Sequence, residues 1–153
     1  WACGIGRRML DELVKKVRGG FGRTGSLAES DSFQEQYAKA EATYRSARAL
    51  VYETWAGVRE SLIRGDALTH EQHTLMRLAM AHITWASHEV AEFMYTASGT
   101  VALRAGTMQR LFRDMHAGTQ HLVASPKVFR GVGQVLAGLA PGKRWMFVDL
   151  IDK

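Results

Sequence analysis

Apolar residues recur at helical spacing along most of the chain, and this pattern gives the first indication of its fold. Intervals of three, four and seven residues place such residues on one face of a helix. The predicted helices cover residues 1–18, 32–64, 69–97, 100–124 and 126–140. No β-type alternation of useful length interrupts them. We therefore predict an all-α fold, an up-and-down four-helix bundle with a short fifth C-terminal helix and tail.

Local signals mark the predicted helix ends. Ser32 with Glu35, and Thr69 with Gln72, each fit a capping box, in which two side chains satisfy the first backbone amides of a helix. The first helix is predicted to stop at residues 19–20, a glycine pair suited to a left-handed residue. These signals favour short connections between long antiparallel helices.

Each long helix has a predicted inward-facing stripe. In the second helix the stripe is Phe33, Tyr37, Ala40, Tyr44, Ala47, Val51, Trp55, Val58 and Leu62. In the third helix it is Leu75, Ala79, Ile83, Ala86, Val90 and Phe93 or Met94. The C-terminal tail contains Trp145, Phe147 and Leu150, is too short to form a core alone, and is predicted to dock on a neighbouring element.

The predicted helix 100–124 carries the densest set of candidate functional groups, and we expect the rest of the chain to be organised around it. Its apolar stripe is Val101, Met108, Leu111, Phe112, Met115 and Leu122. On a continuous helix, Asp114 and His121 would fall nearly on one line, with Gly118 between them. The missing side chain at Gly118 would leave a notch for a flat ligand or for a crossing helix.

Composition places the chain among globular proteins. It has 153 residues, 46% of them hydrophobic and only two prolines, which suits a single helical-bundle domain covering 1–153. Its single cysteine, Cys3, excludes an internal disulfide and is compatible with a cytoplasmic location. No apolar run is long enough for a membrane span. Because the chain opens on Trp1 within a helical pattern, we expect it to be a piece of a longer protein.

The net charge of +5 raises the question of a nucleic-acid partner. The basic residues are scattered through every segment, and no basic helix or aromatic-interleaved patch collects them. Solvated helix faces account for this distribution, so we expect no nucleic-acid partner.

The six histidines were tested for metal-binding spacing. Di-iron bundles need a glutamate three residues before a histidine, and no glutamate in this chain has one. His70 and His73 are three residues apart, but they lie in the first turn of a helix, where we expect exposure. His82 and His88 are expected to be partly exposed or hydrogen-bonded. The sequence therefore predicts no metal site.

One family resemblance emerges from these segments. GIGRRMLDELV, a Gly/Arg/Ser loop, a long Ala-rich helix and MQRLFRDMHAGTQH follow one another in the order typical of one domain. The chain resembles the C-terminal helical domain of the acyl-CoA dehydrogenase superfamily, and more closely its type 2 branch, which includes two-component flavin-dependent monooxygenases. Gln109-Arg110 followed by Arg113-Asp114 is the most specific part of the likeness.

The resemblance implies a flavoprotein oxidoreductase. In such proteins the bundle forms one wall of a site for FAD or FMN and a surface for a homo-oligomer, a tetramer, and a flavin reductase supplies the reduced cofactor. Carried onto this chain, it implies the following roles: His121 catalytic, Arg23, Arg110 and Arg113 cofactor-binding, Asp114 and Gly118 supporting the site. His121 would assist flavin–oxygen chemistry or deprotonate a small-molecule substrate, roles for which histidine is the usual side chain near neutral pH.

Two alternatives remain open from the sequence. In many acyl-CoA dehydrogenases a glutamate base follows the Arg-Asp pair by about two helical turns, whereas this chain has His121-Leu122 there. Leucine takes no proton, although some relatives place the glutamate upstream of the point where this chain begins. The first alternative is thus an acyl-CoA dehydrogenase that oxidises an acyl thioester. The second is a non-catalytic helical module that binds proteins or nucleic acid.

Overall fold

A computed structural model describes residues 1–19 and 27–145 of the chain. Its α-helices are α1 (Ala2–Arg18), α2 (Asp31–Arg64), α3 (His70–Ser98), α4 (Thr107–Thr119) and α5 (Lys127–Leu136). Three short 3-10 helices join them, η1 (Leu27–Glu29), η2 (Gly99–Val101) and η3 (Leu122–Ala124). The described part of the chain contains no strand, so the predicted all-α class is confirmed.

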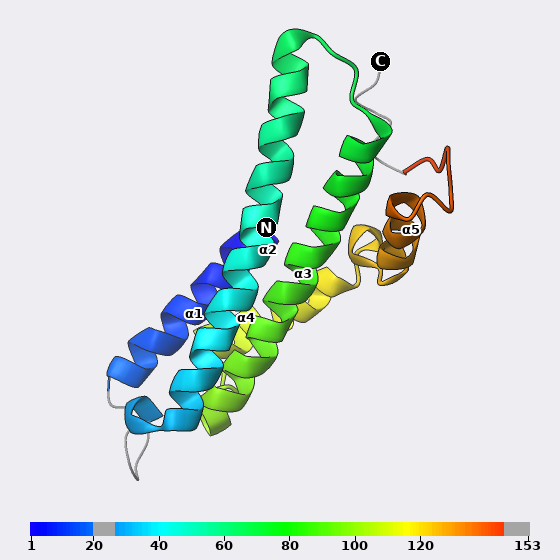
Figure 1. Ribbon diagram of the computed structural model, residues 1–153. Helices are drawn as coiled ribbons and strands as arrows, with labels where there is room; N and C mark the ends of the chain where they lie inside the picture. Colours follow the sequence, from blue (N-terminus) through cyan, green and yellow to red (C-terminus); the bar gives the residue numbers. More distant parts are fainter. Residues whose placement is uncertain (20–26, 146–153) are drawn as a thin grey trace.

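The two longest helices, α2 and α3, form an antiparallel pair that runs the length of the molecule (Figure 1). α1 and α4 pack against one half of this pair, and α5 packs against α3 in the other half. α3 contacts α1, α2, α4 and α5, and it has more buried residues than any other described helix. The chain is therefore organised around α3, which corrects the expectation that residues 100–124 would hold this place.

The core has two parts, one in each half of the molecule. The larger part joins the first four helices and consists of Ala2, Ile5, Met9, Leu10, Leu13, Val17, Ala40, Tyr44, Ala47, Ile83, Ala86, Val90, Ala91, Met94, Met108 and Met115. The smaller part lies under α5 and consists of Val58, Leu68, Met76, Ala81, Val128, Val132 and Trp145. The predicted stripe of α3 is largely confirmed, since only Leu75 and Phe93 of that set are less than fully buried.

The inward stripe of α2 departs from the prediction in its second half. Thr54 and Ser61 are buried there, whereas Trp55 is 40% exposed and Leu62 is 48% exposed. The small residues allow α2 to lie close to α3, and the Oγ of Ser61 accepts a hydrogen bond of 2.8 Å from Nε2 of Gln72. The buried stripe in this half of α2 is therefore shifted by one residue from the predicted stripe, and the large apolar side chains of Trp55 and Leu62 face outward.

One predicted helix start is confirmed, and another lies two residues earlier than predicted. The capping box of Thr69 and Gln72 is present as predicted. α2 begins earlier than predicted, because Ser30 and not Ser32 is its N-cap, with its Oγ accepting from the backbone amide of Phe33. The prediction of a capping box at Ser32 was therefore wrong.

Glycines end two of the helices in different ways. Gly65 follows α2 with φ of 77°, the left-handed geometry that stops a helix at little energetic cost in glycine. Gly19 follows α1 with φ of −77°, so the left-handed residue predicted there is not Gly19. Residue 20 lies outside the described part of the chain.

The predicted single helix 100–124 was wrong. Gly99, with φ of 52°, ends α3, and the chain then forms η2 and a series of turns before Gly106, in extended geometry, leads into α4. α4 ends at Thr119, and His121 is extended with ψ of 139°. Asp114 and His121 consequently do not share a helix face, and Leu122 is 55% exposed.

Trp145 confirms that the tail docks on its neighbours. Its side chain is 6% exposed, and its Nε1 donates a hydrogen bond of 2.9 Å to Oγ1 of Thr74 on α3. Gly138, with φ of 70°, lies just after α5, which ends at Leu136 and not near residue 140. The predicted contacts of Phe147 and Leu150 lie outside the described residues.

An ion-pair network ties α1 to α2. The two terminal nitrogens of Arg7 lie 3.0 Å and 2.8 Å from the two carboxylate oxygens of Glu41. Tyr37 and Arg45 donate to the same carboxylate at 2.8 Å and 2.7 Å. These donors, with Arg7 contributing most, lower the pKa of Glu41 from 4.5 to about 2.

Replacing Glu41 by glutamine should lower the free energy of unfolding by about 1–2 kcal/mol at pH 7, since Glu41 and Arg7 remain 17% and 32% exposed and solvent weakens their attraction. Because the folded pKa lies below the unfolded value, this stabilisation is present above about pH 4.5 and is lost as the pH falls toward 2. Urea unfolding at pH 7, 4 and 2.5 measures it. Glu35→Gln, which removes a fully exposed pair with Lys39, is the control and should change little. A difference between wild type and Glu41→Gln that persists unchanged at pH 2.5 would contradict the assignment.

Candidate functional site

A pocket of about 490 Å³ opens where the start of α1 meets α2, α3 and the end of α4. Its lining residues are Trp1, Ala2, Cys3, Val51, Trp55, Ala79, Met80, Ile83, Thr84, Gly118, His121, Val123 and Ala124. Most of these side chains are apolar, and His121 is the one imidazole among them. An apolar pocket with few polar groups is the usual form of a small-molecule site.

Gly118 allows the aromatic wall of this pocket to form. A Cβ atom built on Gly118 would lie 1.8 Å from Cη2 of Trp1, so the indole ring occupies the space that any side chain would need. The close approach predicted at Gly118 is therefore present, with the ring of Trp1 against the glycine, but Asp114 and His121 do not flank it on one helix face as predicted. The other aromatic wall comes from Trp55 on α2, far from both Trp1 and Gly118 in sequence.

The segment that carries His121 is anchored on α3. Nε1 of Trp85 donates a hydrogen bond of 2.7 Å to the carbonyl oxygen of Ala124, the last residue of η3. Ala124 itself is 3% exposed. The polypeptide after α4 is thus held against the central helix, and His121 is held at the rim of the pocket with it.

His121 has a defined hydrogen-bonding state. Its Nδ1 accepts a hydrogen bond of 3.2 Å from the backbone amide of Val123, which makes His121 the N-cap of η3. Since Nδ1 uses its lone pair in this bond, the proton of the neutral ring is at Nε2. The imidazole is exposed, so this N–H group can donate to an oxygen atom of a bound molecule.

The structure brings together two of the predicted site residues and separates others from them. Gly118 and His121 both line the pocket. Arg110, Arg113 and Asp114 are exposed on α4 and are not among its lining residues; Nε of Arg113 lies 3.9 Å from Oδ1 of Asp114.

Two other placements follow from the structure. Arg23 lies outside the described residues. His73, expected to be exposed, is 7% exposed because the first turn of α3 is covered.

The sequence analysis missed the aromatic walls. Trp55 was interpreted as part of the core stripe, and Trp1 as the first residue of a helix. A signal for Trp55 was available, because the heptad positions Ala47, Thr54 and Ser61 offer an equally regular stripe that leaves it outside. No local signal connects Trp1 with Gly118, since their contact depends on how α1 crosses α4.

None of the helices within residues 1–19 and 27–145 is both long and apolar enough to cross a lipid bilayer.

Comparison with known families defines the class of this bundle. Residues 1–126 match the family model described as acyl-CoA dehydrogenase, C-terminal domain. The chain belongs to this family, which confirms the resemblance seen in the sequence.

The similar proteins include monooxygenases. The chain is 32% identical over 141 residues to an indole-3-acetate monooxygenase from Pseudomonas putida, covering 90% of this chain and 36% of the relative. It is 27% identical over 146 residues to an indole-3-acetate monooxygenase from Acinetobacter baumannii, covering 94% and 38%. A crystal structure of a 3-HSA hydroxylase from a Rhodococcus strain shares the fold, with a TM-score of 0.81 at 23% identity, over 93% of this chain and 38% of that one. The chain thus spans less than two fifths of the length of these proteins.

Proposed function

We propose that this chain is the C-terminal bundle of a flavin-dependent monooxygenase and forms one wall of its flavin and substrate site. The observation that carries the proposal is the pocket in which His121 stands among apolar and aromatic walls. The two indole-3-acetate monooxygenases similar to this chain support it. By the same comparison, the proposed substrate is a small aromatic compound of the indole-3-acetate type.

The described residues fit a flat aromatic group. Trp1 and Trp55 line the pocket together with aliphatic side chains, and stacking on such walls suits the ring system of FAD or FMN as well as an aromatic substrate. Arg110 and Arg113 are exposed on α4, where they are available to a cofactor phosphate held by the rest of the protein. Bound reduced flavin would supply the activation of molecular oxygen.

We assign to His121 the role of a hydrogen-bond donor. The bond that Nδ1 accepts from Val123 leaves the proton of the neutral ring on Nε2, from which it can be donated in a hydrogen bond to an oxygen atom of a bound molecule. A base that abstracts a proton at Nε2 would need the other tautomer, which would lose the Val123 bond. The geometry therefore favours donation over deprotonation. Gly118 supports the site by admitting the ring of Trp1.

The alternative of acyl-CoA dehydrogenation receives no support from the pocket. No carboxylate is present among the lining residues that the structure describes. The acyl-CoA dehydrogenases to which the sequence was compared use a glutamate as the base. We also propose that the protein is cytoplasmic and that a flavin reductase is its partner, since the family resemblance implies both.

We also propose that the chain assembles as a homo-oligomer, a tetramer, through its bundle. The outer face of α2 supports this, because Tyr52, Leu62 and Ile63 are 57%, 48% and 67% exposed. Apolar side chains gathered on one helix face in this way are typical of a surface that another protein covers.

The full-length protein should hydroxylate indole-3-acetate when a reductase supplies reduced flavin under air. Mass spectrometry of the product, with FMN and FAD in parallel, would detect the added oxygen atom. Omitting the reductase is the control and should abolish the product. Oxidation of an acyl-CoA with an artificial electron acceptor, without hydroxylation of any aromatic acid, would contradict the proposal in favour of the dehydrogenase.

A further inference from the structure

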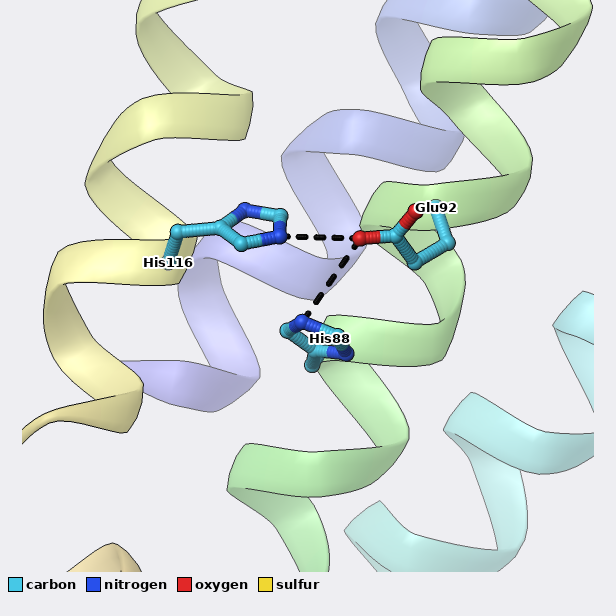
Figure 2. A group of neighbouring side chains, drawn as sticks. All are labelled: His88, Glu92 and His116. Carbon is cyan, nitrogen blue, oxygen red and sulfur yellow. Dashed lines mark hydrogen bonds and ion pairs between the residues drawn. The ribbon is translucent and has the colours of Figure 1, made fainter.

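A cluster of three potential metal ligands lies on the surface where α3 faces α4. His88 and Glu92 are one turn apart on α3, and His116 reaches toward them from α4 (Figure 2). Nε2 of His116 lies 2.8 Å from Oε1 of Glu92, and Nε2 of His88 lies 3.6 Å from the same oxygen. One ligand atom from each residue lies within 4.8 Å of the others. Two imidazoles and a carboxylate therefore converge on one point.

Both ring nitrogens of His116 face oxygen atoms. Nδ1 lies 2.8 Å from the carbonyl oxygen of Phe112, and Nε2 lies 2.8 Å from Glu92. A neutral ring has one proton, and when Nδ1 donates it to the carbonyl, the lone pair of Nε2 points at a carboxylate. Either a second proton or a cation is needed between them. A histidine that binds a metal through one ring nitrogen commonly donates the proton of the other to a carbonyl oxygen, which fixes the orientation of the ring. The contact of His116 Nδ1 with the carbonyl oxygen of Phe112 has this arrangement.

The spacing suits a tetrahedral ion. Metal–ligand bonds of about 2.0–2.1 Å place two ligands about 3.4 Å apart, and the distances from Oε1 of Glu92 to His116 and His88, 2.8 Å and 3.6 Å, lie on either side of this value. His88, Glu92 and His116 are 22%, 51% and 35% exposed, so a cation can enter from solvent and keep a water ligand.

We propose that His88, Glu92 and His116 bind a divalent transition-metal ion of the Zn²⁺ type. Two imidazole nitrogens with one carboxylate oxygen are ligands that Zn²⁺ accepts and that Mg²⁺ does not prefer. None of the three lines the pocket of His121, so the site is separate from the proposed flavin chemistry and stands independently of it. It would link α4 to α3.

Spacing within one helix gave no indication of this site, so the prediction of no metal site from the sequence differs from the present proposal. His88 and Glu92 are separated by four residues in an order that the di-iron pattern does not contain, and the third ligand is 24 residues further along the chain. Only the packing of α4 on α3 brings His116 to the other two.

Metal content of the full-length protein tests the proposal. The protein, free of any histidine tag, is stripped with chelator, dialysed against micromolar Zn²⁺ and then against buffer, and its zinc is measured by mass spectrometry. About one Zn²⁺ per chain should remain in wild type. Each of His88→Ala, Glu92→Gln and His116→Ala should weaken Zn²⁺ binding at least about tenfold. Co²⁺ in place of Zn²⁺ should give a visible absorption band that these variants lose.

Controls separate this site from other histidines. His70→Ala removes an exposed histidine in the first turn of α3 and should leave zinc content unchanged. Circular dichroism confirms that Glu92→Gln, a substitution of similar shape at a half-exposed position, keeps the helices. Wild-type protein without zinc, or zinc that persists in either Glu92→Gln or His116→Ala, would overturn the proposal.

Discussion

In the proposed flavin-dependent monooxygenase, His121→Ala should lower turnover by about two to three orders of magnitude while leaving flavin binding nearly unchanged. The expected loss has a structural reason. His121 is the imidazole that lines the pocket, and its protonated Nε2 is available to an oxygen atom of the substrate or cofactor. Steady-state kinetics with aromatic substrate and reduced flavin would measure turnover, and a flavin titration would measure binding.

A second variant distinguishes chemistry from helix capping. His121→Asn keeps a side-chain acceptor that can take the backbone amide of Val123, since asparagine is a good N-cap, but it lacks the Nε2–H group. We expect turnover of His121→Asn to fall as far as that of His121→Ala. If His121→Asn restored wild-type turnover and pH profile, His121 would serve only to cap η3, and the assignment would be wrong.

Gly6→Ala should destabilise the bundle by about 2–3 kcal/mol, because a single added methyl group has no room where α1 crosses α2 and α3. A Cβ atom on Gly6 would lie 2.6 Å from Oγ of Ser87 and 3.0 Å from two ring carbons of Tyr44. Both neighbours are buried and held by hydrogen bonds to the start of α1, from Ser87 to the carbonyl of Ala2 and from Tyr44 to that of Cys3. Neither can move aside without losing its bond.

Gly4 provides the matched control on the same helix. It is exposed, and a Cβ atom there would meet nothing within 4 Å. Gly4→Ala should therefore leave stability unchanged or raise it by up to about 1 kcal/mol, the gain in helix propensity. Urea unfolding monitored by circular dichroism compares the two. Equal stability of the Gly6 and Gly4 variants would show that the helix crossing is looser than the structure indicates.

The sequence determined the features that depend on residues close together in the chain. Thr69 and Gln72 form their capping box within four residues, and Gly65 stops α2 with its own backbone geometry. The stripe from Ala79 to Met94 was readable because each position is fixed by helical spacing alone. These local rules were enough to predict the all-α class, and the order of the motifs along the chain was enough to indicate the family.

At several points two neighbouring residues gave similar local signals, and the sequence alone could not decide between them. Ser30 and Ser32 are both residue types that cap helices well, and in the structure it is Ser30 whose Oγ accepts the amide of Phe33. On α2, Thr54 and Trp55 are neighbours that could each continue the stripe, and the close packing of α3 selected the smaller one. Between Gly99 and Gly106 the apolar spacing suggested a helix, but the backbone formed turns instead.

Only the tertiary structure decided what the candidate sites contain. The family motif had indicated His121, but its pocket, its tautomer and the ring of Trp1 over Gly118 depend on α1, α3 and η3 coming together. The same holds for His116, which meets His88 and Glu92 only because α4 packs on α3. Sequence periodicity fixes which face of a helix a residue occupies. The distance between faces of different helices is set by how the helices cross, and this follows from the packing of the whole core.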